Sequence, residues 1–105
     1  MRVLAFFILA GSGLLAGCHN AAATPDTYRY SCDSGVRVTA TYPDTDSARV
    51  TYLGREHSMR VDVSASGTRY VGDLLEWWTK GTEGTLLQRN ASGDSDVLEH
   101  CKQQR

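Results

Sequence analysis

Apolar and polar residues alternate along this chain in short segments that turn-forming residues separate. The clearest segment covers residues 59–63, where Met59, Val61 and Val63 alternate with polar or charged neighbours. A period of two indicates a β-strand with one face in the core. Similar segments bounded by Gly, Pro, Asn, Asp and Ser predict further strands at 28–32, 36–42, 49–53, 68–71, 74–79, 85–89 and 96–101.

No segment after residue 27 has the period of a helix. Consecutive short strands with tight turns are typical of antiparallel β-structure, and eight of them close naturally into a small barrel. We therefore predict an all-β fold, a small eight-stranded antiparallel barrel. Trp77 and Trp78 are neighbours in one expected strand, so one should lie in the core and the other at the surface. The residues expected to point inward are Val36, Val38, Val50, Tyr52, Met59, Val61, Val63, Leu75, Trp77, Leu86 and Val97.

The N-terminus has a different pattern. Arg2 is followed by an apolar run over residues 3–9 and then by small residues that lead to Leu15-Ala16-Gly17-Cys18. This pattern is that of a secretory signal and resembles a bacterial lipobox. It predicts a signal peptide over residues 1–17 and a lipid, such as palmitate, on Cys18; an ordinary signal peptide with an incidental cysteine is the alternative.

The remaining chain divides into two parts. Residues 18–27 are small and polar with one proline, which is typical of a tether, and residues 28–105 would form the folded domain. His19 stands where an Asp favours retention in the inner membrane of Gram-negative bacteria. By analogy we expect a lipid-anchored protein of the bacterial cell envelope, in the outer membrane and facing the periplasm.

The chain has three cysteines, so one would be left without a disulfide partner in an exported protein. Lipidation of Cys18 would account for that cysteine. Cys32 and Cys101 then remain in an oxidising compartment, where we expect them to form a disulfide. Such a bond would stabilise the small domain by about 4 kcal/mol on the chain-entropy model.

Charge and composition exclude several classes of function. The chain has 11 basic and 12 acidic residues, a net charge of −1, and no basic stripe, so we expect no nucleic-acid partner. His19, His57 and His100 have no metal-ligating neighbours at useful spacing, so we expect neither a metal nor another cofactor. No Gly-x-Ser-x-Gly motif is present, and a hydrolase is a remote alternative.

Two segments place polar residues beside a glycine at the end of an expected strand. They are Ser64-Ala65-Ser66-Gly67-Thr68-Arg69-Tyr70 and Trp77-Trp78-Thr79-Lys80-Gly81. By themselves they are consistent either with ordinary hairpin turns or with side chains that project for binding.

The order of several short motifs resembles a known family. A lipobox is followed by Tyr30-Ser31-Cys32, by Ser66-Gly67-Thr68-Arg69-Tyr70, by an aromatic strand that ends in Lys80-Gly81, and by Cys101. This order resembles that of the membrane-bound lysozyme inhibitors of c-type lysozyme, over nearly all of the domain. The family fold is an eight-stranded antiparallel barrel with one disulfide. Gly84 departs from the alanine that family members often carry there, which puts the local strand packing in question.

The resemblance implies a function without catalysis. Ser66 and Lys80 would enter the cleft of a c-type lysozyme and contact its catalytic carboxylates, while Gly67, Tyr70 and Gly81 would shape the two turns. Ser64 does not match the motif serine and is a weaker candidate. A homodimer stays open. The competing hypothesis is a non-inhibitory envelope module that binds peptidoglycan or a protein through exposed aromatics, Trp77 or Trp78.

Overall fold

The computed structural model describes residues 26–104. The expected signal peptide, Cys18 and residues 18–25 of the expected tether lie outside the described residues. Eight strands follow one another in the described part: β1 (Thr27–Cys32), β2 (Arg37–Asp44), β3 (Ser47–Tyr52), β4 (Arg55–Asp62), β5 (Thr68–Gly72), β6 (Leu75–Lys80), β7 (Glu83–Arg89) and β8 (Ser95–Gln103). Between residues 26 and 104 there is no helix that is long and apolar enough to cross a membrane.

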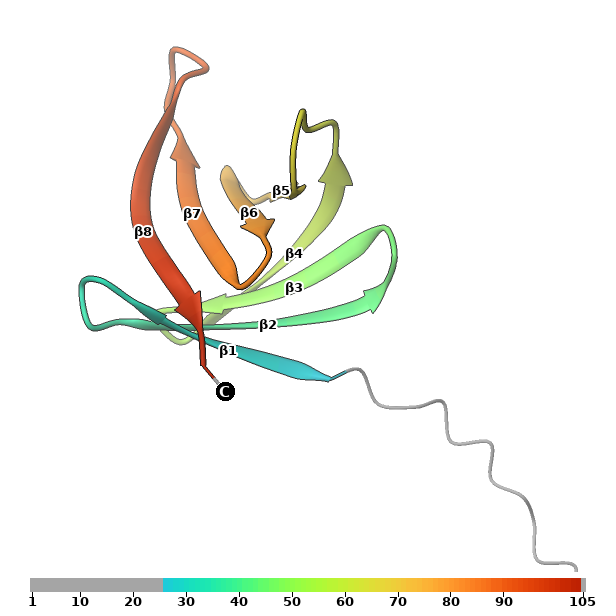
Figure 1. The fold of residues 1–105 in the computed structure, drawn as a ribbon. Coiled ribbons are helices and arrows are strands. Elements are labelled where there is room, and N and C mark those ends of the chain that lie inside the picture. Colours follow the sequence, from blue (N-terminus) through green and yellow to red (C-terminus); the bar gives the residue numbers. More distant parts are fainter. Residues whose placement is uncertain (1–25, 105) are drawn as a thin grey trace, which may run out of the picture.

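The strands form a closed antiparallel barrel in which each strand pairs with the next in the chain and β8 pairs with β1 (Figure 1). The predicted fold is confirmed. In such a meander the connections alternate between the two ends of the barrel. One end, which we call the loop end, carries the β2–β3, β4–β5 and β6–β7 connections, the start of β1 and the end of β8. The opposite end carries the other four hairpin connections.

The predicted disulfide is confirmed. Cys32 and Cys101 are bonded, with an S–S distance of 2.00 Å. They are also direct cross-strand partners where β1 meets β8, so the bond joins the first and last strands of the barrel.

The core occupies the inside of the barrel. Its largest fully buried side chains are Trp77, Met59, Leu86, Val38 and Val50, all of which were predicted to point inward. Trp77 is completely buried and its neighbour Trp78 is 38% exposed, as the strand period requires.

Gly84 makes room for the Trp77 ring. A Cβ built on Gly84 would overlap Cη2 and Cζ2 of Trp77, so the indole occupies the space that an alanine side chain would need. Gly84 pairs with Thr79 and Trp77 pairs with Leu86, so the indole reaches diagonally across the β6–β7 ladder into the space that Gly84 leaves open.

Three residues that were predicted to point inward are exposed. Val63 lies beyond the end of β4 and is 86% exposed, and Val61 lies at the barrel mouth. Val97 is turned outward by a β-bulge, because Leu86 pairs with Glu99 while the next residue, Leu87, pairs with Val97. Two others, Val36 and Tyr52, are half-buried.

Several strand boundaries also differ from those predicted. β4 begins at Arg55, so His57 joins Met59 on the inward face and is buried. The segment from Lys80 to Gly84 was expected to be a loop, but Lys80 ends β6 and Glu83 begins β7. Lys80 therefore projects from the end of a strand in the barrel wall.

Candidate functional site

The candidate site is built from the β4–β5 loop, residues 63–67, and the end of β6. Ser66 is exposed on the loop, and its carbonyl oxygen accepts two hydrogen bonds. One comes from Nε1–H of Trp78, at 2.8 Å, and the other from the Ser64 hydroxyl, at 2.6 Å. The backbone at Ser66 is therefore fixed both from within its own loop and from β6.

Gly67 allows this loop to lie directly against β6. Its φ is +67°, in the left-handed region that glycine adopts without strain. A Cβ at this position would overlap the carbonyl oxygen of Thr79 and would lie 3.3 Å from Cβ of Lys80. Only a glycine therefore fits here, and the close approach brings Ser66 and Lys80 together although they are far apart in the chain.

Lys80 stands at the tight β6–β7 turn. It pairs with Glu83 across the ladder, and Gly81 has a φ of +59° at the first position of the two-residue connection, as type II′ hairpins require. Despite the neighbouring Glu83, Lys80 forms no salt bridge within the described part of the chain. Its ammonium group is exposed at the loop end and available to an acidic partner.

The hydroxyl of Ser66 is also available to a partner. Within residues 26–104 it makes no hydrogen bond, although the carbonyl of the same residue is fully engaged. The structure thus brings together the two predicted contact residues and leaves one hydroxyl and one ammonium for a partner.

Tyr70 lies beneath this site, inside the barrel. It is buried, its ring centroid is 5.4 Å from that of Tyr42, and burial raises the pKa of its phenol. Tyr42 in turn accepts a hydrogen bond of 3.0 Å from Nε1–H of Trp77 and contacts the Tyr30 hydroxyl at 3.2 Å. Burial is also the main cause of the raised pKa of Tyr30. These aromatic side chains fill the barrel mouth at the loop end.

A charged cluster on the outer face lies next to the site, and the sequence patterns did not predict it. Glu76 is buried under Arg69 and Arg89, whose guanidinium groups donate to Oε1 at 2.7 Å and 2.9 Å, and Ser95 adds a hydrogen bond. These donors, with Arg69 the strongest, lower the pKa of Glu76 to about 2. The sequence signal for this cluster was the strand period, which places Glu76 on the same face of β6 as Trp78.

A second buried carboxylate lies inside the barrel. Glu99 accepts hydrogen bonds from the hydroxyl groups of Ser34 and Tyr52, and the pKa of Tyr52 is raised by burial and by the Glu99 charge. Glu99 pairs with the inward-facing Leu86 and lies two residues before the buried Cys101, so the strand period places it on the inner face. It is remote from Ser66 and Lys80 and has a structural role.

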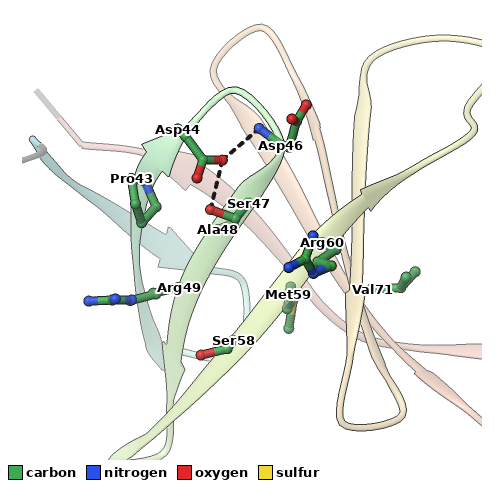
Figure 2. A pocket seen from close by; sticks show the side chains of 10 residues that line it. All are labelled: Pro43, Asp44, Asp46, Ser47, Ala48, Arg49, Ser58, Met59, Arg60 and Val71. Carbon is green, nitrogen blue, oxygen red and sulfur yellow. Dashed lines mark hydrogen bonds between the residues drawn. The ribbon is translucent and has the colours of Figure 1, made fainter.

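A large hollow in the described surface lies elsewhere (Figure 2). It has a volume of about 670 Å³ and is bordered by the β2–β3 hairpin and β4. Asp44 is occupied there by hydrogen bonds from the Asp46 backbone N–H, at 2.8 Å, and from the Ser47 hydroxyl, at 2.9 Å. The side chain of Arg49 points away from that of Arg60.

Metal ligands do not gather in the described region. No group of three His, Cys, Asp or Glu side chains there could hold an ion. His57 Nδ1 lies within hydrogen-bond distance of the Asp73 carboxylate, at 3.1 Å, at the end of the barrel opposite the loop end.

Comparison with known proteins decides the family. The family model described as membrane-bound lysozyme-inhibitor of c-type lysozyme matches residues 30–95, which include both turns of the candidate site. The chain belongs to this family of lysozyme inhibitors. The family is one of inhibitor proteins and not of enzymes.

Two relatives of this inhibitor family are similar over most of the chain. A protein of Cupriavidus necator named membrane-bound lysozyme inhibitor of C-type lysozyme is 37% identical, over 90% of this chain and 86% of its own. A protein of the same name from Escherichia coli strain K12 is 29% identical, over 75% of this chain and 69% of its own.

Proposed function

We propose that this domain inhibits c-type lysozyme by inserting Ser66 and Lys80 into the active-site cleft. The proposal is based mainly on the β4–β5 loop, in which Gly67 lies against Lys80. Among the described residues, no neighbour binds the Ser66 hydroxyl or the Lys80 ammonium. The relatives named as inhibitors of C-type lysozyme support it.

The chemistry of the two groups suits the proposed target. Lysozyme cleaves its glycan with a protonated glutamic acid and an ionised aspartate set close together. The Lys80 ammonium supplies three donors and a positive charge, and the Ser66 hydroxyl can donate to the second carboxylate. Within a cleft that is partly shielded from water, such charge-assisted hydrogen bonds are stronger than exposed ones. Inhibition then requires occupancy alone and no covalent step.

We also infer that the domain is held at a membrane by lipid on Cys18. Residues 1–17 would be removed as a signal peptide, and residues 18–27 would tether the domain that starts at residue 28. The lipobox-like Leu15-Ala16-Gly17-Cys18 and the words "membrane-bound" in the names of both relatives support this inference. The absence of Asp after Cys18 favours the outer membrane of the cell envelope, facing the periplasm.

The proposal is tested by lysis of peptidoglycan-bearing cells with a c-type lysozyme and the purified domain from residue 19 to 105. We expect the domain to inhibit lysis and Lys80→Ala to weaken inhibition by at least tenfold, since a buried charged contact contributes more than 1.4 kcal/mol. Arg55→Ala is the matched control, because it removes the same charge at the opposite end of the barrel.

Each outcome has a definite meaning. Equal inhibition by the Lys80→Ala and Arg55→Ala variants would contradict the proposed contact. No inhibition by a folded wild-type domain would contradict the function and favour the alternative of an envelope module that binds through the exposed Trp78.

A further inference from the structure

The β4–β5 loop is fixed to the barrel wall at two points. Nε1–H of Trp78 donates to the Ser66 carbonyl at 2.8 Å, and the Arg69 guanidinium donates to the Val63 carbonyl at 3.3 Å. Both donors belong to strands in the sheet, on which they are direct cross-strand partners. The loop between these points carries the Ser66 hydroxyl.

Arg69 is itself held firmly. Its Nη2 donates to Oε1 of Glu76 at 2.7 Å, and its Nη1 lies 3.5 Å from the Asp62 carboxylate at the end of β4. Its side chain therefore has little freedom, and the start of the loop is tied to the outer charge cluster.

Trp78 fixes the β4–β5 loop at its second attachment, the Ser66 carbonyl, next to the candidate contact residues. Lys80 follows it by two residues on the same face of β6, and the indole nitrogen would lie 3.0 Å from a Cβ built on Gly67. No other hydrogen bond joins Ser66 to β6 in the described structure, because the second donor to its carbonyl, Ser64, is in the loop itself. The indole N–H is thus the link between the backbone of Ser66 and the strand that ends in Lys80.

We propose that Trp78 is a positioning residue for inhibition: its indole N–H fixes Ser66 relative to Lys80, so that both groups are presented together to the enzyme. This inference rests on the proposed function. A loop that is already ordered loses less conformational entropy when it binds, and affinity rises for that reason.

The test is a double-mutant cycle on the inhibition constant for a c-type lysozyme. Trp78→Phe removes the N–H donor and keeps an aromatic ring on the same face. We expect inhibition about tenfold weaker, in line with the loss of one hydrogen bond and the ordering it provides, from a domain that remains folded at the assay temperature. In the Ser66→Ala background the same change should cost little more, because Trp78 acts through Ser66. In the Lys80→Ala background its full effect should remain.

A second measurement protects the test from a folding defect. The amplitude of backbone motion at Ser66, from NMR relaxation of the unbound domain, should increase in Trp78→Phe while that at Lys80 stays unchanged. Ser64→Ala, which removes the other donor to the same carbonyl, should weaken inhibition in the same direction.

The outcomes separate this inference from the proposed function. If the wild-type domain inhibits but the losses from Trp78→Phe and Ser66→Ala are fully additive, Trp78 acts independently of Ser66 and the inference is overturned alone. Unchanged inhibition or unchanged motion at Ser66 in Trp78→Phe would overturn it as well. A wild-type domain that does not inhibit would overturn the function and the inference together.

Discussion

Gly84 and Trp77 form a matched pair at the centre of the barrel. The indole of Trp77 fills the space that a side chain at position 84 would occupy, and Trp77 is wholly buried. We expect Gly84→Ala to lower the free energy of unfolding by about 1–3 kcal/mol, because an overpacked core must shift its side chains or its backbone. Urea unfolding measures this change in the free energy of unfolding. Stability equal to that of the wild type in Gly84→Ala would show that the ring can move aside.

Glu76 is the residue whose ionisation contributes most clearly to stability. Its pKa is lowered from 4.5 to about 2 by Arg69, Arg89 and Ser95, so the folded state binds its proton less readily than the unfolded chain does. This contribution is complete above pH 4.5 and is lost as the pH falls toward 2, and a shift of this size corresponds to ~3 kcal/mol.

Unfolding by urea between pH 7 and pH 2 tests this assignment. The wild type should lose stability steeply in the acid range, whereas Glu76→Gln should be less stable at pH 7 and lose less on acidification. Asp44, whose pKa is also lowered, titrates in both proteins and cancels in the comparison. Parallel curves for the two proteins would contradict the assignment.

At the scale of elements, the ladder between β1 and β8 is one of the two shortest in the barrel, with as few residue pairs as the ladder between β4 and β5. It covers only Tyr30–Cys32 against Cys101–Gln103, and the disulfide forms its last pair. The disulfide links the two strands that close the barrel, and it also joins residues that are 69 positions apart in the chain. We expect the double variant Cys32→Ser/Cys101→Ser to be less stable by about 4 kcal/mol on the chain-entropy model. Thermal unfolding under oxidising conditions checks this; an unchanged midpoint would mean that the ladder closes the barrel without help.

Strand period and turn chemistry were enough to predict the elements, their number and their meander order. They also separated Trp77 from Trp78, because alternation within one strand depends on nothing outside it. They failed at Val97, since a bulge reverses the alternation there and depends on how β7 and β8 align. Period alone also could not show that Val63 lies beyond the strand, where the barrel no longer covers it.

The candidate site could be predicted only in part. Motif order pointed to Ser66 and Lys80, but the bond from Trp78 to the Ser66 carbonyl arises from the register of β5 and β6 and from the close approach at Gly67. Such contacts join segments that are distant in sequence, so no local pattern contains them.

For the whole molecule, the position of the first strand relates anchoring to inhibition. β1 begins at the loop end, the same end that presents Ser66 and Lys80. A lipid on Cys18 would therefore attach the domain from the side on which lysozyme is expected to bind, and residues 18–27 would have to leave room for the enzyme.

We expect Cys18→Ala to move the protein from the membrane fraction to the soluble fraction, because no acyl chain could then hold it. The released protein should inhibit lysozyme at least as well as the anchored one, since no membrane would lie near the loop end. Fractionation and a lysis assay on the soluble protein measure both effects. Retention of Cys18→Ala in membranes would contradict lipid anchoring at this residue.

Binding of the purified domain to a c-type lysozyme, measured by calorimetry with the cleft empty and with the cleft filled by an oligosaccharide, tests cleft blockade most directly. We expect one-to-one binding that the oligosaccharide suppresses and that Lys80→Ala weakens by at least tenfold. Binding that is equally tight when the cleft is filled would contradict it, because Ser66 and Lys80 could not then reach the catalytic carboxylates.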